Sequence, residues 1–223
     1  MESATQIVGT WLSRRPHPWS GILAGFVTLI LISIGLLGLR DVAGLSEILP
    51  ASKNLVFQQH QYWRLWTTLF AHANEKHLLS NSFLFFILGS FLTGYFGFAA
   101  FPGFALFFGG LTNAIVLSHL PEEVRLIGMS GVVFWLGGAW LSLYLFLDRR
   151  KSFYQRVLRV IGVGLLLFFP AEAFDPSISY LSHLVGFLLG LAWGTVYFFW
   201  HRRKFRAVEV HASLSNEEEE LSL

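Results

Sequence analysis

Four polar side chains in an otherwise apolar sequence could together carry out a nucleophilic reaction. Ser130 lies between two glycines in GMSG, at the start of a long apolar stretch. His183 opens the apolar stretch HLVGFLLG, and His77 and Asn81 are the first and last residues of HLLSN. A serine hydroxyl is a weak nucleophile that needs a base within hydrogen-bonding reach, and an imidazole can be that base. A second histidine and an asparagine could donate hydrogen bonds to a developing oxyanion.

The composition assigns the chain to the polytopic membrane proteins. Apolar residues make up 54% of the 223 residues, charged residues only 13%, and the mean hydropathy is positive. Soluble domains carry about 25% charged residues. The sequence has no cysteine, which excludes disulfides, thiolate metal sites and cysteine nucleophiles. Its basic clusters stand beside the apolar segments, so they predict orientation in a lipid bilayer and no nucleic-acid partner.

The apolar segments predict an all-α bundle of six transmembrane helices, because a bilayer core of about 30 Å takes roughly 20 helical residues. Residues 77–121 contain no Lys, Arg, Asp or Glu and are long enough for two crossings, with a turn at 95–103. The other predicted spans are residues 21–39, 126–147, 157–174 and 178–200. The first outer loop, residues 40–76, is long and rich in Trp, Phe and Leu, so we expect part of it to be embedded in the membrane interface.

The basic residues predict the orientation of these spans. With the N-terminus inside, the inner segments hold eleven of the 16 Lys and Arg residues and the outer segments hold five. The positive-inside rule then places both termini in the cytoplasm, in a bacterial inner membrane. The chain divides into a cytoplasmic segment (1–20), a six-span core (21–200) and a cytoplasmic tail (201–223) that is first basic, then acidic and expected to be disordered.

This topology brings the four polar residues to one depth. Ser130 lies four residues into the fourth predicted span and His183 five residues into the sixth, and both spans enter from the outer side. His77 and Asn81 open the second span, also from the outer side. At 1.5 Å per residue, all four lie within roughly 8 Å of the same boundary. Nucleophile, base and hydrogen-bond donors are therefore expected at one level of the membrane.

Helical spacing predicts which spans are neighbours. His183, Gly186 and Gly190 fall on one face of the sixth span, and Phe134 shares a face with Ser130 on the fourth. Small residues let membrane helices approach closely, so these two spans are expected to pack directly on each other. Taken alone, a serine or a glycine in a membrane span is more often a packing residue than a catalytic one. An intramembrane histidine is by default a candidate for function.

The same motifs resemble those of a known family. In chain order they are YWRLW in the first outer loop, HLLSN at the second span, GMSG at the fourth and HLVGFLLG on the sixth. Together they resemble the rhomboid intramembrane serine proteases, and the resemblance extends from the first span to Trp200. It implies that Ser130 is the nucleophile and His183 the general base, acting as a dyad without a carboxylate. His77, Asn81 and the backbone N–H of Ser130 would form the oxyanion hole.

The resemblance also assigns supporting roles. Gly128, followed after the serine by Gly131, would let backbone and substrate approach the nucleophile. Phe134 stands where an aromatic residue, often tyrosine, packs on the catalytic imidazole. Trp63 and Arg64 match a loop motif with a structural or lipid-facing role.

The function implied is that of an intramembrane serine endopeptidase that cuts transmembrane proteins near the outer face of the bilayer. Helical carbonyls are already hydrogen-bonded, so the substrate must unravel locally, which favours helix-breaking, small-residue segments. No metal or organic cofactor is implied.

Two other classes of protein remain possible on the sequence. A transporter also places histidines and glycines within its spans, although here the polar residues gather at one depth and trace no path. A non-catalytic rhomboid-like chaperone or adaptor would keep the fold, but such proteins typically lack the serine or the histidine. Within the proteases, a peptidase that processes C-terminal sorting anchors is a further subtype.

Overall fold

The computed structural model describes residues 5–168 and 179–213, most of which are helical. Five helical segments are long and apolar enough to cross a membrane. They are Ser20–Leu39 (α1), Glu75–Phe96 (α4), Ala99–His119 (which ends in α5, Ala105–His119), Ser130–Leu147 (α6) and Tyr180–Arg206 (α8). A further helix, α7, is described over Phe153–Phe168, and two short helices, α2 (Leu45–Ile48) and α3 (Arg64–Thr67), lie in the loop between α1 and α4. The chain is therefore a helical polytopic membrane protein.

Where the structure describes them, the predicted spans agree with these helices to within two residues, except at the starts of the fourth and fifth spans and at the end of the sixth, where α8 continues to Arg206 instead of ending at residue 200. The fourth helix begins at Ser130 instead of residue 126, because Leu126 pairs with Ala51 in an extended bridge and Gly128 has a φ of +98°. The fifth begins at Phe153 instead of residue 157. Its predicted part from 169 to 174 lies outside the described residues, as does the predicted start of the sixth span at 178. The count of six spans therefore stays a prediction.

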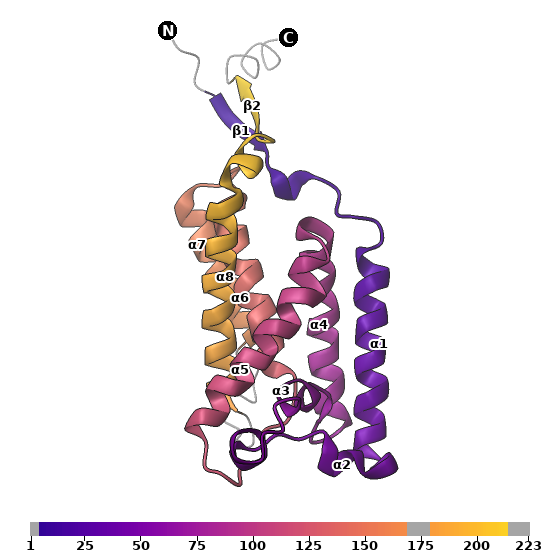
Figure 1. Ribbon diagram of the computed structural model, residues 1–223. Helices are drawn as coiled ribbons and strands as arrows, with labels where there is room; N and C mark the ends of the chain where they lie inside the picture. Colours follow the sequence, from indigo (N-terminus) through magenta and orange to yellow (C-terminus); the bar gives the residue numbers. More distant parts are fainter. Residues whose placement is uncertain (1–4, 169–178, 214–223) are drawn as a thin grey trace.

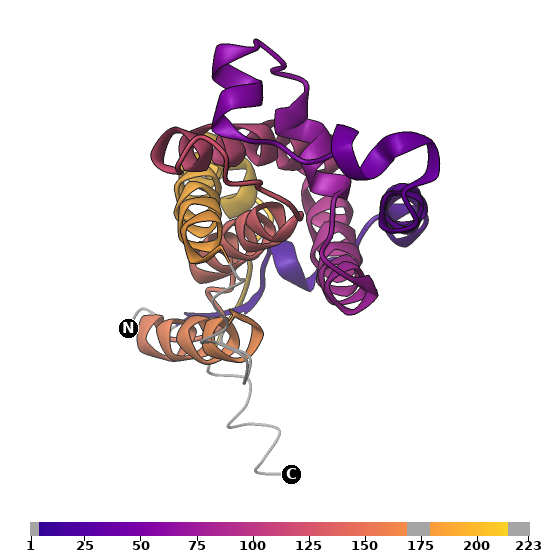
Figure 2. The ribbon, with the colours of Figure 1, turned by 90° about the horizontal axis from the view of Figure 1, so that it is seen from below.

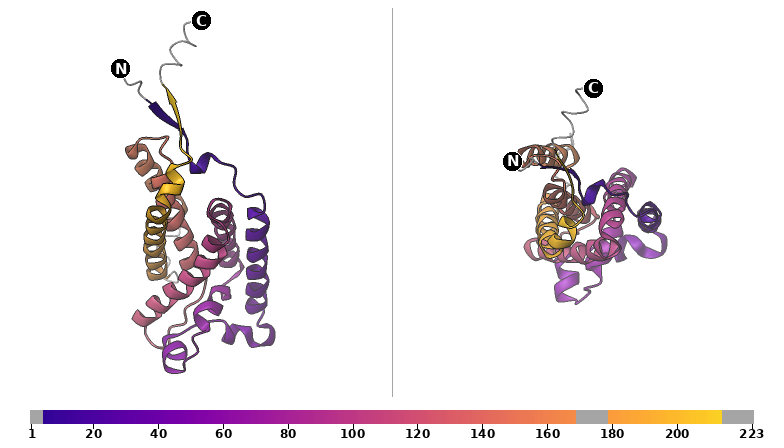
Figure 3. Two further views of the ribbon diagram at one scale, coloured as in Figure 1. Left: turned by 45° about the horizontal axis from the view of Figure 1, so that its top comes forward. Right: turned by 90° about the horizontal axis from the view of Figure 1, so that it is seen from above.

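The helices run between two ends of the molecule (Figure 1). At the strand end, β1 (Thr5–Gly9) and β2 (Val210–Ser213) form an antiparallel pair. At the opposite end, which we call the loop end, residues 40–74 gather with α2 and α3. Viewed from the loop end, α6 lies between α4 and α8, and α1 packs against α4 at the edge (Figure 2). α5 crosses the bundle obliquely and contacts both α6 and α8 (Figure 3).

The strand pair corrects the expectation that residues 201–223 are a disordered tail. α8 continues to Arg206, and Val210–Ser213 then pairs with Thr5–Gly9. Residues 210–213 form a strand because β1 and β2 satisfy each other's backbone hydrogen bonds. Residues 214–223, which include the acidic run, lie outside the described residues.

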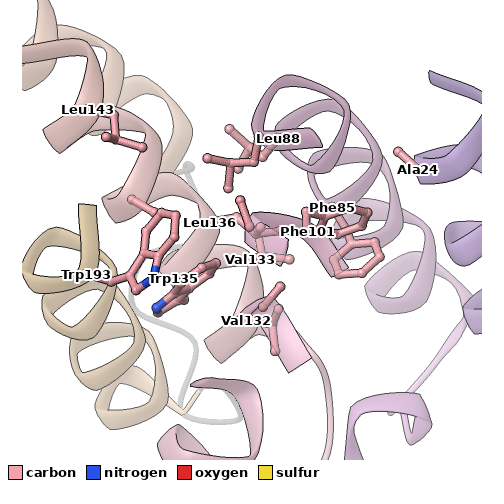
Figure 4. Close-up of a cluster of buried hydrophobic side chains, with 14 of the residues drawn as sticks. Ala24, Phe85, Leu88, Phe101, Val132, Val133, Trp135, Leu136, Leu143 and Trp193 are labelled. Atoms are coloured by element: carbon pink, nitrogen blue, oxygen red, sulfur yellow. The ribbon is translucent and has the colours of Figure 1, made fainter. Parts of the chain in front are cut away.

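A buried apolar cluster surrounds α6 (Figure 4). Trp135 of α6 is fully buried, and its ring lies 5.1 Å, centroid to centroid, from that of Trp193 on α8. On the other side of α6, Leu136 and Val133 face Leu88 of α4 (Figure 4). α6 therefore contributes core residues toward both α4 and α8, as expected for the central helix of the bundle.

Glycines bring the backbones of α6 and α8 into direct contact, as the spacing of small residues predicts. A Cβ atom on Gly186 would overlap the carbonyl oxygen of Gly131, and one on Gly190 would overlap the carbonyl oxygen of Trp135. From the other side, a Cβ on Gly138 would overlap the carbonyl oxygen of Phe187. Because the obstructing atoms are backbone, no side-chain rotation can relieve these overlaps. This is the largest helix–helix contact in the described residues.

Arg64 organises the chain at the loop end. Its side chain is 8% exposed, and Nη1 lies 2.9, 2.6 and 2.7 Å from the carbonyl oxygens of Glu47, Ile48 and Pro50. The guanidinium also packs over the ring of Trp63, 4.6 Å from its centroid. A planar, always charged group suits several carbonyls at once. Arg64 therefore makes structural contacts within the loop, whereas the structural or lipid-facing role that the resemblance gives the tryptophan–arginine motif stays a prediction.

We expect the glycine contact to be sensitive to a single methyl group. Gly190→Ala should lower the thermal unfolding midpoint, because overpacking a tight contact costs about 1–3 kcal/mol. The matched control is Gly162→Ala on α7, where a Cβ meets nothing within 4 Å. That change should leave the midpoint unchanged or raise it, since alanine favours helix. Equal midpoints for the two variants would contradict the contact.

Replacing Arg64 should loosen the loop without changing its charge. Arg64→Lys keeps one positive charge but loses the planar fork, which leaves buried carbonyls without a donor. We expect a loss of about 2–3 kcal/mol in the free energy of unfolding, measured in mixed micelles. Arg40→Lys, at an exposed position at the start of the same loop, is the control and should be neutral. Neutrality at both positions would show that the carbonyl contacts do not hold the loop.

Candidate active site

Ser130 is presented by a turn that the loop end holds in place. Leu126 exchanges backbone hydrogen bonds with Ala51, at 2.7 and 3.2 Å, and its carbonyl also accepts one from the Thr68 hydroxyl. The Gly128 N–H donates to the Thr68 carbonyl at 3.1 Å. The positive φ of Gly128 then turns the chain into α6, whose first residue is Ser130.

This position has a chemical consequence. The first backbone N–H groups of a helix have no acceptor within the helix and carry the positive end of its dipole. The half-buried Ser130 side chain therefore stands beside N–H donors that point away from the helix body.

His183 lies in the first turn of α8, and its ring is fixed against α6. The half-buried imidazole stacks on the ring of Phe134, with centroids 4.0 Å apart and ring planes 10° from parallel. Phe134 is one helical turn beyond Ser130 on α6. A Cβ added to Gly131 would lie 3.5 Å from the carbonyl oxygen of Ser182, the residue before His183. The imidazole thus belongs to the same local cluster as the serine.

His77 reaches the same cluster from α4. The Asn74 side chain caps α4 by accepting a hydrogen bond of 2.8 Å from the His77 N–H, which fixes the first turn. A Cβ on Gly128 would lie 3.1 Å from Cε1 and 3.4 Å from Nε2 of the His77 ring. The imidazole edge therefore faces the backbone two residues before Ser130, at a position that only a glycine leaves open.

Asn81 follows His77 by one turn of α4 and carries an unusual polar group. Its side chain is 8% exposed, and among the described residues its Nδ2 has no hydrogen-bond partner. A buried amide donor without a partner is costly unless water or a ligand meets it. A donor that forms its hydrogen bond only with a bound ligand is expected to be unpaired in this way.

The structure adds His72, which the sequence reasoning missed. It lies in the loop before α4, is 8% exposed, and its Nδ1–H donates to the Phe70 carbonyl at 3.1 Å. Its ring meets that of His77 edge to face, with centroids 5.1 Å apart. Burial lowers the pKa of His72 to about 4, so its ring is neutral near pH 7. No periodic pattern marks a residue in a loop. The one feature of the sequence that could have pointed to His72 is that it lies five residues before His77.

Three helices and one loop thus meet at the loop end, with Ser130, His183, His77 and Asn81 on the three helices. Contacts bring the surroundings of Ser130 together with His183 and His77, and Asn81 lies one turn further along α4, whereas the matched depth and the catalytic roles of the four residues stay predictions. Phe134 stacks on the His183 ring and Gly128 lies two residues before Ser130, while Trp63 and Arg64 lie in the loop before α4. Over residues 5–168 and 179–213, no three His, Asp or Glu side chains gather as metal ligands would.

The lowered pKa of His72 predicts a pH-dependent stability. A histidine in the unfolded chain has a pKa near 6.5. Between about pH 4 and 6.5, the unfolded state therefore binds a proton at residue 72 that the folded state does not bind. Its contribution to stability is therefore complete above about pH 6.5 and is lost as the pH falls toward 4. His72→Asn should reduce this acid-induced fall in the unfolding midpoint.

His60→Asn is the control, because His60 is an exposed histidine of the same loop with a hydrogen bond to the Tyr62 hydroxyl. It should follow the wild-type midpoint across the pH range. An unchanged acid response in His72→Asn would contradict the assignment.

Comparisons with known proteins identify a family for this chain. The family model described as Rhomboid domain matches residues 59–200, more than half of the chain. RHOMBOID-like protein 2 of Arabidopsis thaliana is 31% identical over 63% of this chain and 44% of its own length. The putative rhomboid protease YdcA of Bacillus subtilis is 29% identical over 72% of this chain and 85% of its own. Rhomboid protease GlpG of Haemophilus influenzae is 26% identical over 62% and 71%.

The chain covers less than half of the length of the first two Arabidopsis relatives, 44% of RHOMBOID-like protein 2 and 36% of RHOMBOID-like protein 1. The matched region nonetheless runs from the loop that precedes α3 to the part of α8 that contains His183 and its glycines. The chain belongs to the rhomboid family of polytopic membrane proteins.

Proposed function

We propose that this protein is an intramembrane serine endopeptidase that cleaves transmembrane proteins through a Ser130–His183 dyad. One observation carries the proposal, namely the polar groups found at one end of the bundle. A serine begins α6, an imidazole stacks on Phe134 one helical turn beyond it, and α4 carries a buried amide that has no partner among the described residues. The family supports it, since two of the relatives are named as rhomboid proteases, one of them putatively.

In the proposed reaction, neutral His183 accepts the Ser130 hydroxyl proton while Oγ attacks the carbonyl carbon of the scissile bond. The resulting oxyanion accepts hydrogen bonds from the Ser130 backbone N–H, the His77 ring and Asn81 Nδ2. The imidazolium then gives its proton to the leaving amine, and an acyl-enzyme remains on Ser130. Water, deprotonated by His183, attacks this ester and regenerates the free serine.

The position of the site restricts the substrate. It lies at the loop end of the bundle, near one membrane boundary, so the scissile bond belongs near the end of a substrate's transmembrane segment. Carbonyls in an intact membrane helix already accept hydrogen bonds, so small and helix-breaking residues around the cut favour the extended conformation needed for attack. The loop end faces outward if the basic strand end lies in the cytoplasm of a bacterial inner membrane.

Replacing either residue of the dyad should abolish cleavage while preserving the fold. Ser130→Ala and His183→Ala are each expected to leave expression, helicity and the unfolding midpoint near wild type, with no cleavage of a model transmembrane substrate. The control is Ser142→Ala, which removes a hydroxyl from the same helix far from the site. Wild-type cleavage by Ser130→Ala in a clean preparation would end the protease proposal and favour a chaperone or adaptor.

Two asparagines provide a test of transition-state stabilisation. Asn81→Ala should lower kcat by about 10²–10³, because one oxyanion donor is lost. Since Asn81 Nδ2 has no partner among the described residues, stability should hardly change. Asn113→Ala should do the reverse, because Nδ2 of Asn113 donates to the Leu65 carbonyl at 2.8 Å inside the protein. A change in KM alone for Asn81→Ala would point to substrate binding instead.

A further inference from the structure

A tryptophan at the strand end is held in a fixed position between distant parts of the chain. Trp11 lies in the short helical turn Trp11–Ser13, ahead of α1. Its indole N–H donates to the Tyr95 carbonyl at the end of α4, at 3.0 Å. Its ring meets Phe205 near the end of α8 edge to face, with centroids 5.1 Å apart. The ring therefore joins the N-terminal segment to α4 and α8.

Two cations converge on this ring. Cζ of Arg14 lies 5.0 Å and Nζ of Lys204 5.1 Å from the Trp11 ring centroid, both within cation–π range. Both side chains are exposed, and they come from opposite ends of the chain. Because both distances are measured to the same centroid, the two like charges lie within about 10 Å of each other, where they repel each other unless an anion accompanies them.

Within residues 5–168 and 179–213, two acidic side chains near this end of the molecule, Asp148 and Glu209, are already paired. Asp148 binds Arg150 at 2.7 Å, and Glu209 binds Arg149 at 2.9 Å and Arg206 at 3.0 Å. Among the described residues, neither cation beside Trp11 has a carboxylate within ion-pair distance. The pair is therefore left with uncompensated charge where the bundle meets the membrane boundary.

An exposed aromatic residue adjoins Lys204 on α8, toward the apolar part of the helix. Trp200 is 83% exposed and lies one helical turn before Lys204, on the same face of α8. Tryptophan at such a position marks the level of the lipid headgroups. The surface thus has two cations on the aqueous side and an apolar ring below them, which is the polarity of a phospholipid.

We propose that Arg14, Trp11 and Lys204 form a binding site for the phosphate of an anionic phospholipid, with the acyl chains passing beside Trp200. Arg14 supplies a planar set of donors and Lys204 a mobile point charge, both of which suit phosphate oxygens. A lipid bound there would connect the segment before α1 with the end of α8, the two parts that the strand pair also joins.

The test measures lipid retention by the full chain with native mass spectrometry, using mixed phosphatidylglycerol and phosphatidylcholine. The wild type should retain phosphatidylglycerol preferentially. Arg14→Gln/Lys204→Gln should weaken that retention by roughly 10–30-fold, as expected for two cations near a headgroup. The matched control, Arg15→Gln/Arg203→Gln, removes the same charge from exposed neighbours of the two cations that lie over the Trp11 ring and should behave as wild type.

Equal losses in both double variants would mean diffuse attraction to basic charge and would overturn the site, as would a wild type without preference. Lys204→Arg, which keeps the cation, should retain the lipid. An excess of inorganic phosphate should not displace it, and displacement would mean a site for free anions instead. A preference that appears only when glutamates 217–220 are changed to glutamine would show that the acidic tail occupies the cations, which also contradicts the proposal.

Discussion

The close approach of α6 and α8 is the constraint on which the candidate site depends. Gly186 meets the carbonyl of Gly131, so the two backbones touch one turn after His183 and one residue after Ser130. Lipid tails are as apolar as leucine, so hydrophobicity alone gives membrane helices little reason to associate, and close packing must hold them together. The contact therefore fixes both the separation of the two helices and the relative height of the two polar residues.

The serine is also positioned from the aqueous side. Arg64 donates to the carbonyls of residues 47, 48 and 50, and the next residue, Ala51, pairs with Leu126 in the strand-like segment that leads to Gly128. The loop that Arg64 organises thus holds the start of the segment 126–131, and the glycine contact between α6 and α8 holds its end. The sequence separates these parts by more than a hundred residues, whereas the fold makes them neighbours.

Hydropathy predicts the five long apolar helices that the structure shows, and the alternating direction of successive spans predicts that the polar residues lie at one end. It could not predict where α6 begins, because the φ of Gly128 and the pairing of Leu126 leave no trace in an apolar run. The strand pair was missed because it joins residues about 200 positions apart, beyond any local pattern. His72 was missed because a loop residue has no periodicity to mark it.

The central claim is that Ser130 is a nucleophile activated by its surroundings, and covalent labelling tests it most directly. Purified protein would be treated with a fluorophosphonate, digested and mapped by mass spectrometry. The account predicts a single adduct on Ser130 that disappears in the His183→Ala variant. Cleavage activity accompanied by an adduct on a different serine, or by no adduct at all, would contradict it.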